Sequence, residues 1–318
     1  MEIVHTPVLL NETLKLLSPI GESYEKDCFM IDSTTGEGGH SQAFLMQYPS
    51  LHILGLDADP NIQLRAKERL ASFGDRMKFK LGWFNEFYAD YSEAERQPDI
   101  ILFDLGISVY HYERSGRGFS FRHDEPLDMR LNENAGQNAE DLVNGLREEE
   151  LANVIFNYGE ERYSRRIARA IVEQRVHSRI VSTKELADII YNAVPSAYRH
   201  GGIHPATKSF QAIRIAVNGE LDRLQAVLKD AFRVLKPGGK MGVITFHSLE
   251  DRIVKNYFRD LGKKCICPPE QPFCTCGGKP RAKVLTRKPI GPTEEEVKIN
   301  SPSRSAKLRG VKKLGESK

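Results

Sequence analysis

A glycine-rich turn is the clearest chemical signal in this chain. It follows the apolar run Cys28–Asp32 and holds Gly36, Gly38 and Gly39. Glycines in a turn permit positive φ and let a ligand approach the backbone closely, and a helix predicted after them offers free N–H groups. Asp57 ends the next apolar run, where a carboxylate can accept hydrogen bonds from ribose hydroxyls. The two features predict a site for a cofactor that contains adenosine.

The spacing of this turn discriminates between such cofactors. A dinucleotide fingerprint needs a third glycine where Ser41 stands, and no Gly-Lys-Ser/Thr sequence marks a phosphate-binding loop. The order Asp32-x-Thr34-x-Gly36-x-Gly38 instead resembles the first motif of class I S-adenosylmethionine-dependent methyltransferases, with Thr34 in place of a usual glycine. The run Leu235–Gly239 (Leu-Lys-Pro-Gly-Gly) before an apolar stretch is also typical of those enzymes. We therefore expect S-adenosylmethionine as the cofactor.

The elements that must position these residues form an α/β pattern. Helical stretches alternate with apolar runs, as in a parallel sheet covered on both faces. The apolar runs predict five strands, at Cys28–Asp32, His52–Asp57, Met77–Leu81, Asp99–Asp104 and Met241–Phe246. Helical periodicity replaces the alternation in 137–194, and a long helix is predicted over 208–235. We expect a Rossmann-like domain of residues 1–108 and 208–318, with a helical domain of residues 109–207 inserted between strands four and five as the RNA substrate domain.

Charge is unevenly distributed along the 318 residues. The whole chain has 46 Lys and Arg against 43 Asp and Glu, but residues 279–318 alone have 12 against 4, a local charge of +8. This basic tail predicts an anionic partner such as nucleic acid, although a solvated tail is the alternative. No apolar run reaches the ~18 residues of a membrane span, and the N-terminus does not resemble a signal peptide. We expect a cytoplasmic protein without a membrane partner.

Long motifs in one order make the chain resemble the ribosomal RNA small subunit methyltransferase H family, also called MraW. They run almost end to end and include 5–10, 38–41, 104–108, 117–122, 126–130, 158–174, 204–207, 210–218, 246–252 and 304–309. The resemblance implies methylation of the exocyclic N4 of one cytidine in the decoding region of 16S rRNA, within the small ribosomal subunit. It also implies a Rossmann-like catalytic domain that carries a helical insert, and it leaves the oligomeric state open, a dimer included.

The resemblance also assigns cofactor contacts. These fall on the glycine turn, the ribose carboxylate, an aromatic residue beside the adenine, the end of strand four and the segment after it: Gly38, Gly39, His40, Asp57, Phe84, Asp104 and His111. The family usually has Gln at the last of these positions. A neutral imidazole can donate only one hydrogen bond there.

The chemistry requires a group that accepts the proton of a poorly nucleophilic amino group. Asp104 after strand four and His247 after strand five are the candidate catalytic residues, and no metal is required. Asp104 could equally serve only the cofactor, and His247 could make only a structural hydrogen bond. DNA amino-methyltransferases carry an Asp/Asn/Ser-Pro-Pro-aromatic motif that this chain lacks, which disfavours DNA. The intact glycine turn disfavours a non-catalytic RNA-binding factor.

The motif Arg117–Arg122 follows the fourth predicted strand, with aromatic residues between arginines. Such residues suit a splayed base and its phosphates, although the same loop could be pinned to the core by its aromatic rings. The predicted substrate-binding residues are Arg117, Phe119, Phe121, Arg130, Lys208, Arg214, Ser248 and Arg252. The arginines of 162–169 form a basic helix face that either contacts RNA or is simply exposed to solvent.

Four of the five cysteines lie close together, at Cys265, Cys267, Cys274 and Cys276. Four thiolates can hold zinc, but Cys-x-Cys is tighter than the usual Cys-x2-Cys spacing. Reduced thiols in a surface loop are the preferred interpretation, so we expect no metal.

Overall fold

Two compact units make up the chain in the computed structural model. The structure describes residues 7–19, 27–92, 94–133, 136–265, 267–268, 270–273, 275 and 278–315. Two of the four candidate zinc ligands, Cys274 and Cys276, lie outside the described residues. Unit 1 comprises Met1–Ile107 and Asp222–Lys318, and unit 2 comprises Ser108–Leu221. The chain returns to unit 1 later than residue 208, because α11 (Ala206–Asn218) packs against α7 (Glu148–Gly159) within unit 2.

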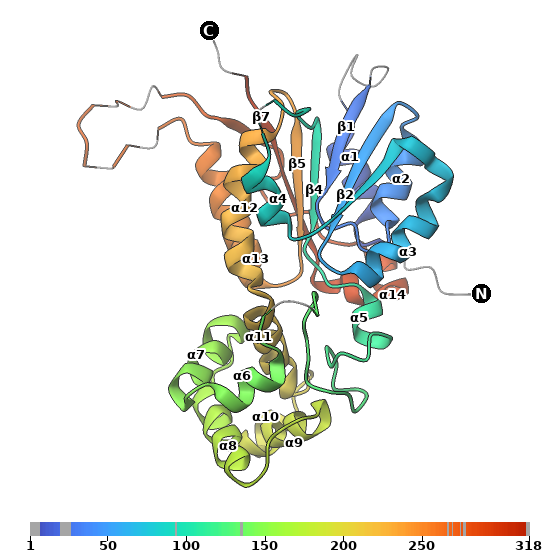
Figure 1. The fold of residues 1–318 in the computed structure, drawn as a ribbon. Coiled ribbons are helices and arrows are strands. Elements are labelled where there is room, and N and C mark those ends of the chain that lie inside the picture. Colours follow the sequence, from blue (N-terminus) through green and yellow to red (C-terminus); the bar gives the residue numbers. More distant parts are fainter. Residues whose placement is uncertain are drawn as a thin grey trace. The chain divides into compact units, whose positions relative to one another are not determined.

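The described part of unit 1 holds a seven-stranded sheet in the order β3-β2-β1-β4-β5-β7-β6, which confirms the predicted Rossmann-like α/β class (Figure 1). The first five strands are parallel, and β7 is antiparallel to both of its neighbours. The bounds are β1 (Cys28–Asp32), β2 (Leu51–Asp57), β3 (Met77–Leu81), β4 (Ile100–Asp104), β5 (Lys240–Thr245), β6 (Ala282–Val284) and β7 (Lys307–Lys313). The strand order reverses between β1 and β4, and open α/β sheets bind ligands at the carboxyl ends of strands at such a point.

Alternate side chains of the strands bury two apolar faces. Ile31 and Phe103 pack with α4 (Phe84–Asp90), α12 (Glu220–Val234) and α13 (Ser248–Leu261). The residues one position away, Met30 and Leu102, pack with helices on the opposite face, α1 (Leu10–Leu17), α2 (Gly39–Gln47) and α3 (Pro60–Leu70). Figure 1 shows the two helical layers on either side of the sheet. Burial on both faces explains why these strands have continuous apolar sequences.

The C-terminal segment is not simply a tail, because much of it is folded into unit 1. β7 pairs with β5 along its length, and Leu308 and Val311 are buried in the core. α14 (Glu294–Ile299) and a 3₁₀ turn (Ser301–Ser305) precede β7. The alternative of a solvated tail over residues 279–318 is therefore wrong for β7.

Unit 2 is helical. Its helices are α5 (Val109–Glu113), α6 (Ala139–Gly145), α7, α8 (Ser164–His177), α9 (Thr183–Ala193), α10 (Ser196–Arg199) and α11. The single helix predicted over 208–235 is wrong, because Gly219 adopts φ 59° and ends α11 before α12 begins. A left-handed glycine is a common helix terminator. Within the described residues, no helix combines the length and apolar character needed to cross a bilayer.

Candidate active site

The glycine turn joins β1 to α2 in unit 1. Gly36 and Gly38 have φ of 53° and 81°, and Gly38 is the N-cap of α2. A Cβ on Gly38 would lie 2.7 Å from Leu70 Cδ1, and one on Gly39 would collide with Pro7. A Cβ on Gly36 would meet only the carbonyl of Thr34, 4.0 Å away. Packing thus requires the second and third glycines, whereas Gly36 leaves the backbone open to a ligand.

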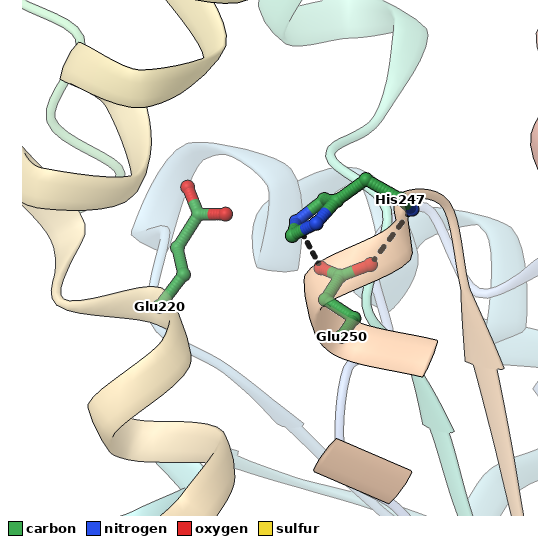
Figure 2. A group of neighbouring side chains, drawn as sticks. All are labelled: Glu220, His247 and Glu250. Atoms are coloured by element: carbon green, nitrogen blue, oxygen red, sulfur yellow. Dashed lines mark hydrogen bonds and ion pairs between the residues drawn. The ribbon is translucent and has the colours of Figure 1, made fainter. Parts of the chain in front are cut away.

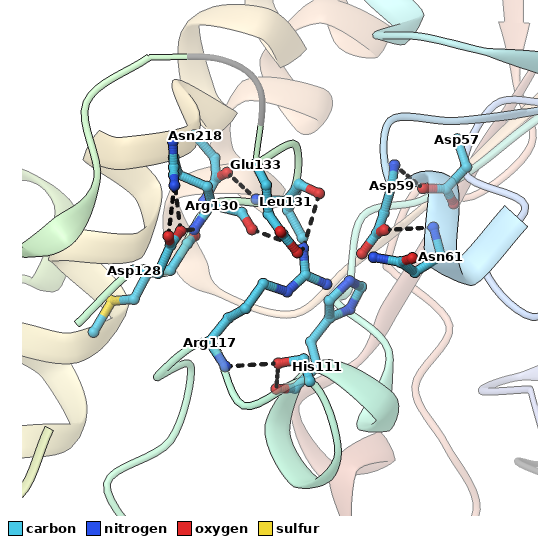
Figure 3. Close-up of polar contacts among 12 residues, drawn as sticks. Asp57, Asp59, Asn61, His111, Arg117, Asp128, Arg130, Leu131, Glu133 and Asn218 are labelled. Carbon is cyan, nitrogen blue, oxygen red and sulfur yellow. Dashed lines mark hydrogen bonds and ion pairs between the residues drawn. The ribbon is translucent and has the colours of Figure 1, made fainter. Parts of the chain in front are cut away.

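Asp57, at the end of β2, is oriented by two backbone donors. Its Oδ2 accepts a hydrogen bond from Gly36 N–H at 2.8 Å, and its Oδ1 accepts one from Asp59 N–H at 2.9 Å. Asp59 in turn caps α3 through Asn61 N–H, as Figure 3 shows. The carboxylate predicted to face a ribose is therefore fixed against the glycine turn itself.

Asp104 ends β4 beside the turn after β1. Its N–H donates to Thr34 Oγ1 at 2.6 Å, and its Oδ2 lies 3.5 Å from His40 Nε2. Nearby, Asp32 is completely buried and accepts a hydrogen bond from Ser41 Oγ at 2.6 Å. Burial raises the pKa of Asp32 above its ordinary value, and the nearby Asp104 charge adds to the rise, although Ser41 and His40 oppose it.

Several buried polar atoms of this group lack hydrogen-bond partners among the described residues. They are Asp104 Oδ1, Asp32 Oδ1 and both ring nitrogens of His40. Buried polar atoms are normally satisfied, so such a group points to a ligand. Carboxylates beside an imidazole suit a ligand that is cationic and brings N–H donors. S-adenosylmethionine, with a sulfonium and an ammonium group, fits these residues.

Phe84 begins α4 directly after the loop that follows β3. Its ring meets Phe103 edge-on, with centroids 5.6 Å apart, and it is half-buried. Next to it, the Arg223 guanidinium lies over the Trp83 ring, 3.9 Å from the ring centroid. The parallel strands place this loop at the same edge of the sheet as Asp57 and Asp104.

His247 is the N-cap of α13, just after β5 (Figure 2). Its Nε2 lies 3.1 Å from Glu250 Oε1, and Glu250 Oε2 accepts hydrogen bonds from the backbone N–H groups of Phe246 and His247 at 2.8 and 3.3 Å. Glu250 is only 3% exposed. The imidazole is therefore held by its own helix, whereas Ser248 and Arg252 on α13 are exposed.

The remaining predicted residues lie in unit 2. Among them, Arg117 is only 7% exposed. Its Nη1 donates to the carbonyls of Arg130 and Leu131 at 3.0 and 3.1 Å and lies 3.5 Å from Glu133 (Figure 3). The guanidinium also lies 5.6 Å from the ring centroid of Phe119. These contacts show Arg117 stabilising the loop that contains Arg130.

The aromatic residues of this loop also pack within unit 2. Phe119 is 5% exposed, and its ring centroid is 5.2 Å from that of His111. Phe121 is half-buried against His204 and Phe210, with centroids 4.7 and 4.9 Å away. Base stacking by these two rings stays a prediction, as does the cofactor contact of His111.

Three further cations of unit 2 have polar partners. Arg130 forms a two-point ion pair with Asp128, at 2.9 and 2.6 Å, and Arg214 forms one with Glu220, at 2.9 and 2.8 Å. Lys208 Nζ donates to the carbonyl of Glu160 at 3.4 Å. Their predicted contacts with substrate remain predictions.

The sequence did not identify Thr34, Asp128, Glu220 or Glu250 as parts of these networks. Only Glu250 had a local signal, because a glutamate three residues after an N-cap is the pattern of a capping box. The other partners are distant in sequence or lie in loops without a regular period.

Comparison with known proteins places these features in a family context. A family model described as the MraW methylase family matches residues 2–314. The ribosomal RNA small subunit methyltransferase H of Treponema denticola is 59% identical, over 99% of this chain and 98% of that protein. The proteins of the same name from Carboxydothermus hydrogenoformans and Treponema pallidum are 47% and 44% identical, over 99% and 98% of this chain and 99% and 93% of their own lengths.

Proposed function

The chain belongs to the MraW methylase family, and we propose that it methylates the exocyclic N4 of a cytidine in the decoding region of 16S rRNA, within the small ribosomal subunit. One observation carries this proposal beyond the family match: buried Asp104 and His40 atoms without hydrogen-bond partners, at the point where the strand order reverses. When bound, S-adenosylmethionine supplies an electrophilic methyl group.

The residues around Asp104 provide alignment and a proton acceptor. The N4 lone pair of cytosine is delocalised into the ring, so a group must accept a hydrogen bond from the amino group and later take its proton. The Asp104 carboxylate can do this because Thr34 fixes the backbone of Asp104 at the end of β4 and the carboxylate lies 3.5 Å from the His40 imidazole. His247 is a second candidate on the same edge of the sheet, oriented by Glu250.

Unit 2 supplies the RNA-binding surface in this proposal. It contains the arginine-rich start of α8 and the loop of Arg117, Phe119 and Phe121. Arginines pair with phosphates, and aromatic rings stack on unpaired bases. The exposed arginines among these are those of α8, and of the two rings only Phe121 is partly exposed. A site for RNA in a separate unit leaves the glycine turn and Asp57 of unit 1 to the cofactor.

The test is methyl transfer from labelled S-adenosylmethionine to three substrates: small ribosomal subunits from cells that lack the methylation, naked 16S rRNA, and duplex DNA. We expect label in 16S rRNA, and nucleoside analysis should identify it as N4-methylcytidine. An Asp57→Ala variant is the control, since loss of the carboxylate at the glycine turn should abolish incorporation. Label in DNA alone, on another atom or base, or nowhere would overturn the proposal.

A further inference from the structure

A buried glutamate organises the turn between α7 and α8 of unit 2. Glu161 is 0% exposed, and its carboxylate accepts hydrogen bonds from Tyr163 N–H at 2.8 Å and from the Tyr198 hydroxyl at 2.6 Å. Burial, followed by the hydrogen bond and charge of Glu161, raises the pKa of Tyr198 to about 12. The hydroxyl is therefore a permanent donor, and it joins α10 to the turn.

Arg162, the next residue, lies against both tyrosines. Its guanidinium carbon is 4.8 Å from the ring centroid of Tyr163 and 5.1 Å from that of Tyr198. The two rings meet edge to face, with centroids 4.9 Å apart. Arg162 is nevertheless exposed. Among the described residues, no ion pair joins it to a carboxylate, in contrast to Arg130 and Arg214.

A guanidinium held in this way is prepared to bind an anion. Aromatic rings attract a guanidinium through its positive charge and do not use its N–H groups as strong hydrogen-bond donors, so these groups stay available to an anion. The planar guanidinium fork matches two oxygens of a phosphate. Because the tyrosines already restrict the side chain, less conformational entropy is lost when the anion binds.

The surroundings of Arg162 are positive. Arg165 and Arg166 are exposed in the first turn of α8, at the end of the helix where the macrodipole favours anions. Lys208 lies at the same turn, through its hydrogen bond to the Glu160 carbonyl. Phe156, in the last turn of α7, is 56% exposed and offers an apolar face to a base or sugar.

The charged side chains that line a groove near the other end of α8 are mainly acidic, although the last turn of the helix carries Arg175 and His177. The groove, of about 710 Å³, lies between the C-terminal half of α8 and α9. Its lining includes four carboxylates, from Asp124, Glu173, Glu185 and Asp188, against one ammonium group, from Lys184. Because phosphates are repelled there, an RNA backbone on unit 2 is directed to the N-terminal end of α8.

We propose that Arg162, which lies against the rings of Tyr163 and Tyr198, binds a backbone phosphate of the RNA substrate, with Arg165 and Arg166 extending the contact along the strand. The inference rests on the proposed function, because that function supplies RNA as the partner. It assigns Arg162 a binding role and Glu161 a positioning role.

The test compares Arg162→Gln with Arg147→Gln in the full-length protein. Arg147 is an equally charged, 82% exposed arginine of the same unit, already paired with Glu150 at 2.6 Å. The probe is the purified, unmethylated small ribosomal subunit, and its Kd is measured over a series of salt concentrations. Loss of a phosphate contact should raise the Kd about tenfold and reduce the slope of log Kd against log salt by about 0.7–0.9. Arg147→Gln should leave both quantities close to wild type.

Two further measurements separate this inference from the alternatives. Arg162→Lys should recover the salt slope but not the full affinity, because an ammonium lacks the planar fork. Binding of S-adenosylhomocysteine and the melting temperature should be the same in wild type and Arg162→Gln. An Arg162→Gln variant that matches Arg147→Gln, or that loses cofactor binding or stability, overturns the inference. A wild-type protein that neither binds nor methylates the subunit overturns the proposed function instead.

Discussion

The hydroxyl of Thr34 accepts a 2.6 Å hydrogen bond from the backbone N–H of Asp104. The first residue lies in the turn after β1 and the second at the end of β4, so one side chain joins the two segments that flank the reversal of strand order. Thr34 stands where the methyltransferase motif usually has glycine. The departure from the motif therefore adds a contact that fixes the backbone from which the Asp104 carboxylate projects.

Replacing Thr34 by valine should weaken cofactor binding. Valine keeps the shape of threonine but removes the acceptor, which leaves the Asp104 N–H without its partner at a cost of about 1–3 kcal/mol. We expect the Kd of S-adenosylhomocysteine, measured by calorimetry, to rise at least tenfold. Thr34→Ser retains the hydroxyl and should bind as the wild type does. Equal affinities for the valine and serine variants would show that the hydrogen bond does not position Asp104 for the ligand.

Asp104→Asn separates a catalytic role from a purely cofactor-binding one. The amide has nearly the same shape but cannot take a proton from the N4 amino group. If the carboxylate acts as the acceptor, kcat at saturating cofactor should fall by about 10²–10⁴-fold, in addition to any loss of cofactor affinity. The measurement is single-turnover methyl transfer to small ribosomal subunits. An unchanged kcat with a raised KM for S-adenosylmethionine would leave Asp104 as a cofactor ligand only.

The sequence predicted those parts of the fold that local patterns determine. β1 has the predicted bounds because a continuous apolar run and a glycine turn mark it. β3 also has the predicted bounds, from a short alternation of apolar residues with lysine. β7 escaped prediction because its strand alternates apolar residues with lysine and arginine and pairs with β5, which is distant in the chain. Two cationic side chains of the basic tail, Lys307 and Arg309, lie against Asp251.

Within the candidate site, residue identities were more predictable than their partners. The motifs predicted ligand-facing carboxylates at Asp57 and Asp104, and the structure places both residues at strand ends. No sequence pattern connects Thr34 with Asp104, or Glu161 with Tyr198, since these contacts form only when distant segments pack together.

Phe119→Ala tests whether the Phe119 ring packs the loop of Arg117 or stacks on a base of the RNA. Phe119 is 5% exposed and contacts the His111 ring, so truncation should leave a cavity and lower the free energy of unfolding by about 3–5 kcal/mol. Urea denaturation followed by tyrosine fluorescence and circular dichroism measures this loss. Phe119→Leu, which refills most of the volume, should recover much of it. Normal stability combined with weak binding of small ribosomal subunits would instead favour base stacking.

Asp251 on α13 should make the stability of unit 1 depend on pH. Arg309 on β7 donates to its two oxygens at 2.6 and 3.2 Å, and Lys307 Nζ lies 3.5 Å away. Burial on its own would raise the pKa of Asp251, but the hydrogen bonds and charges of Arg309 and Lys307 hold it below its ordinary value of 3.8. A carboxyl whose folded pKa is depressed stabilises the fold above the unfolded pKa and loses that contribution as pH falls through the folded pKa.

Asp251→Asn should therefore be less stable than wild type at pH 7, by about 1–3 kcal/mol, because the buried Arg309 loses a charged acceptor. The difference should shrink as the pH falls below 3.8 and on through the lower folded pKa, below which the wild-type carboxyl is also neutral in the folded protein. Urea unfolding at several pH values measures it. Asp260→Asn is the matched control on the same helix, since Asp260 is half-exposed and pairs with Lys263 at 2.6 Å, and its loss should cost less than about 1 kcal/mol. A difference for Asp251→Asn that is the same at pH 3 and pH 7 would mean that packing, and not the charge of Asp251, stabilises the contact between α13 and β7.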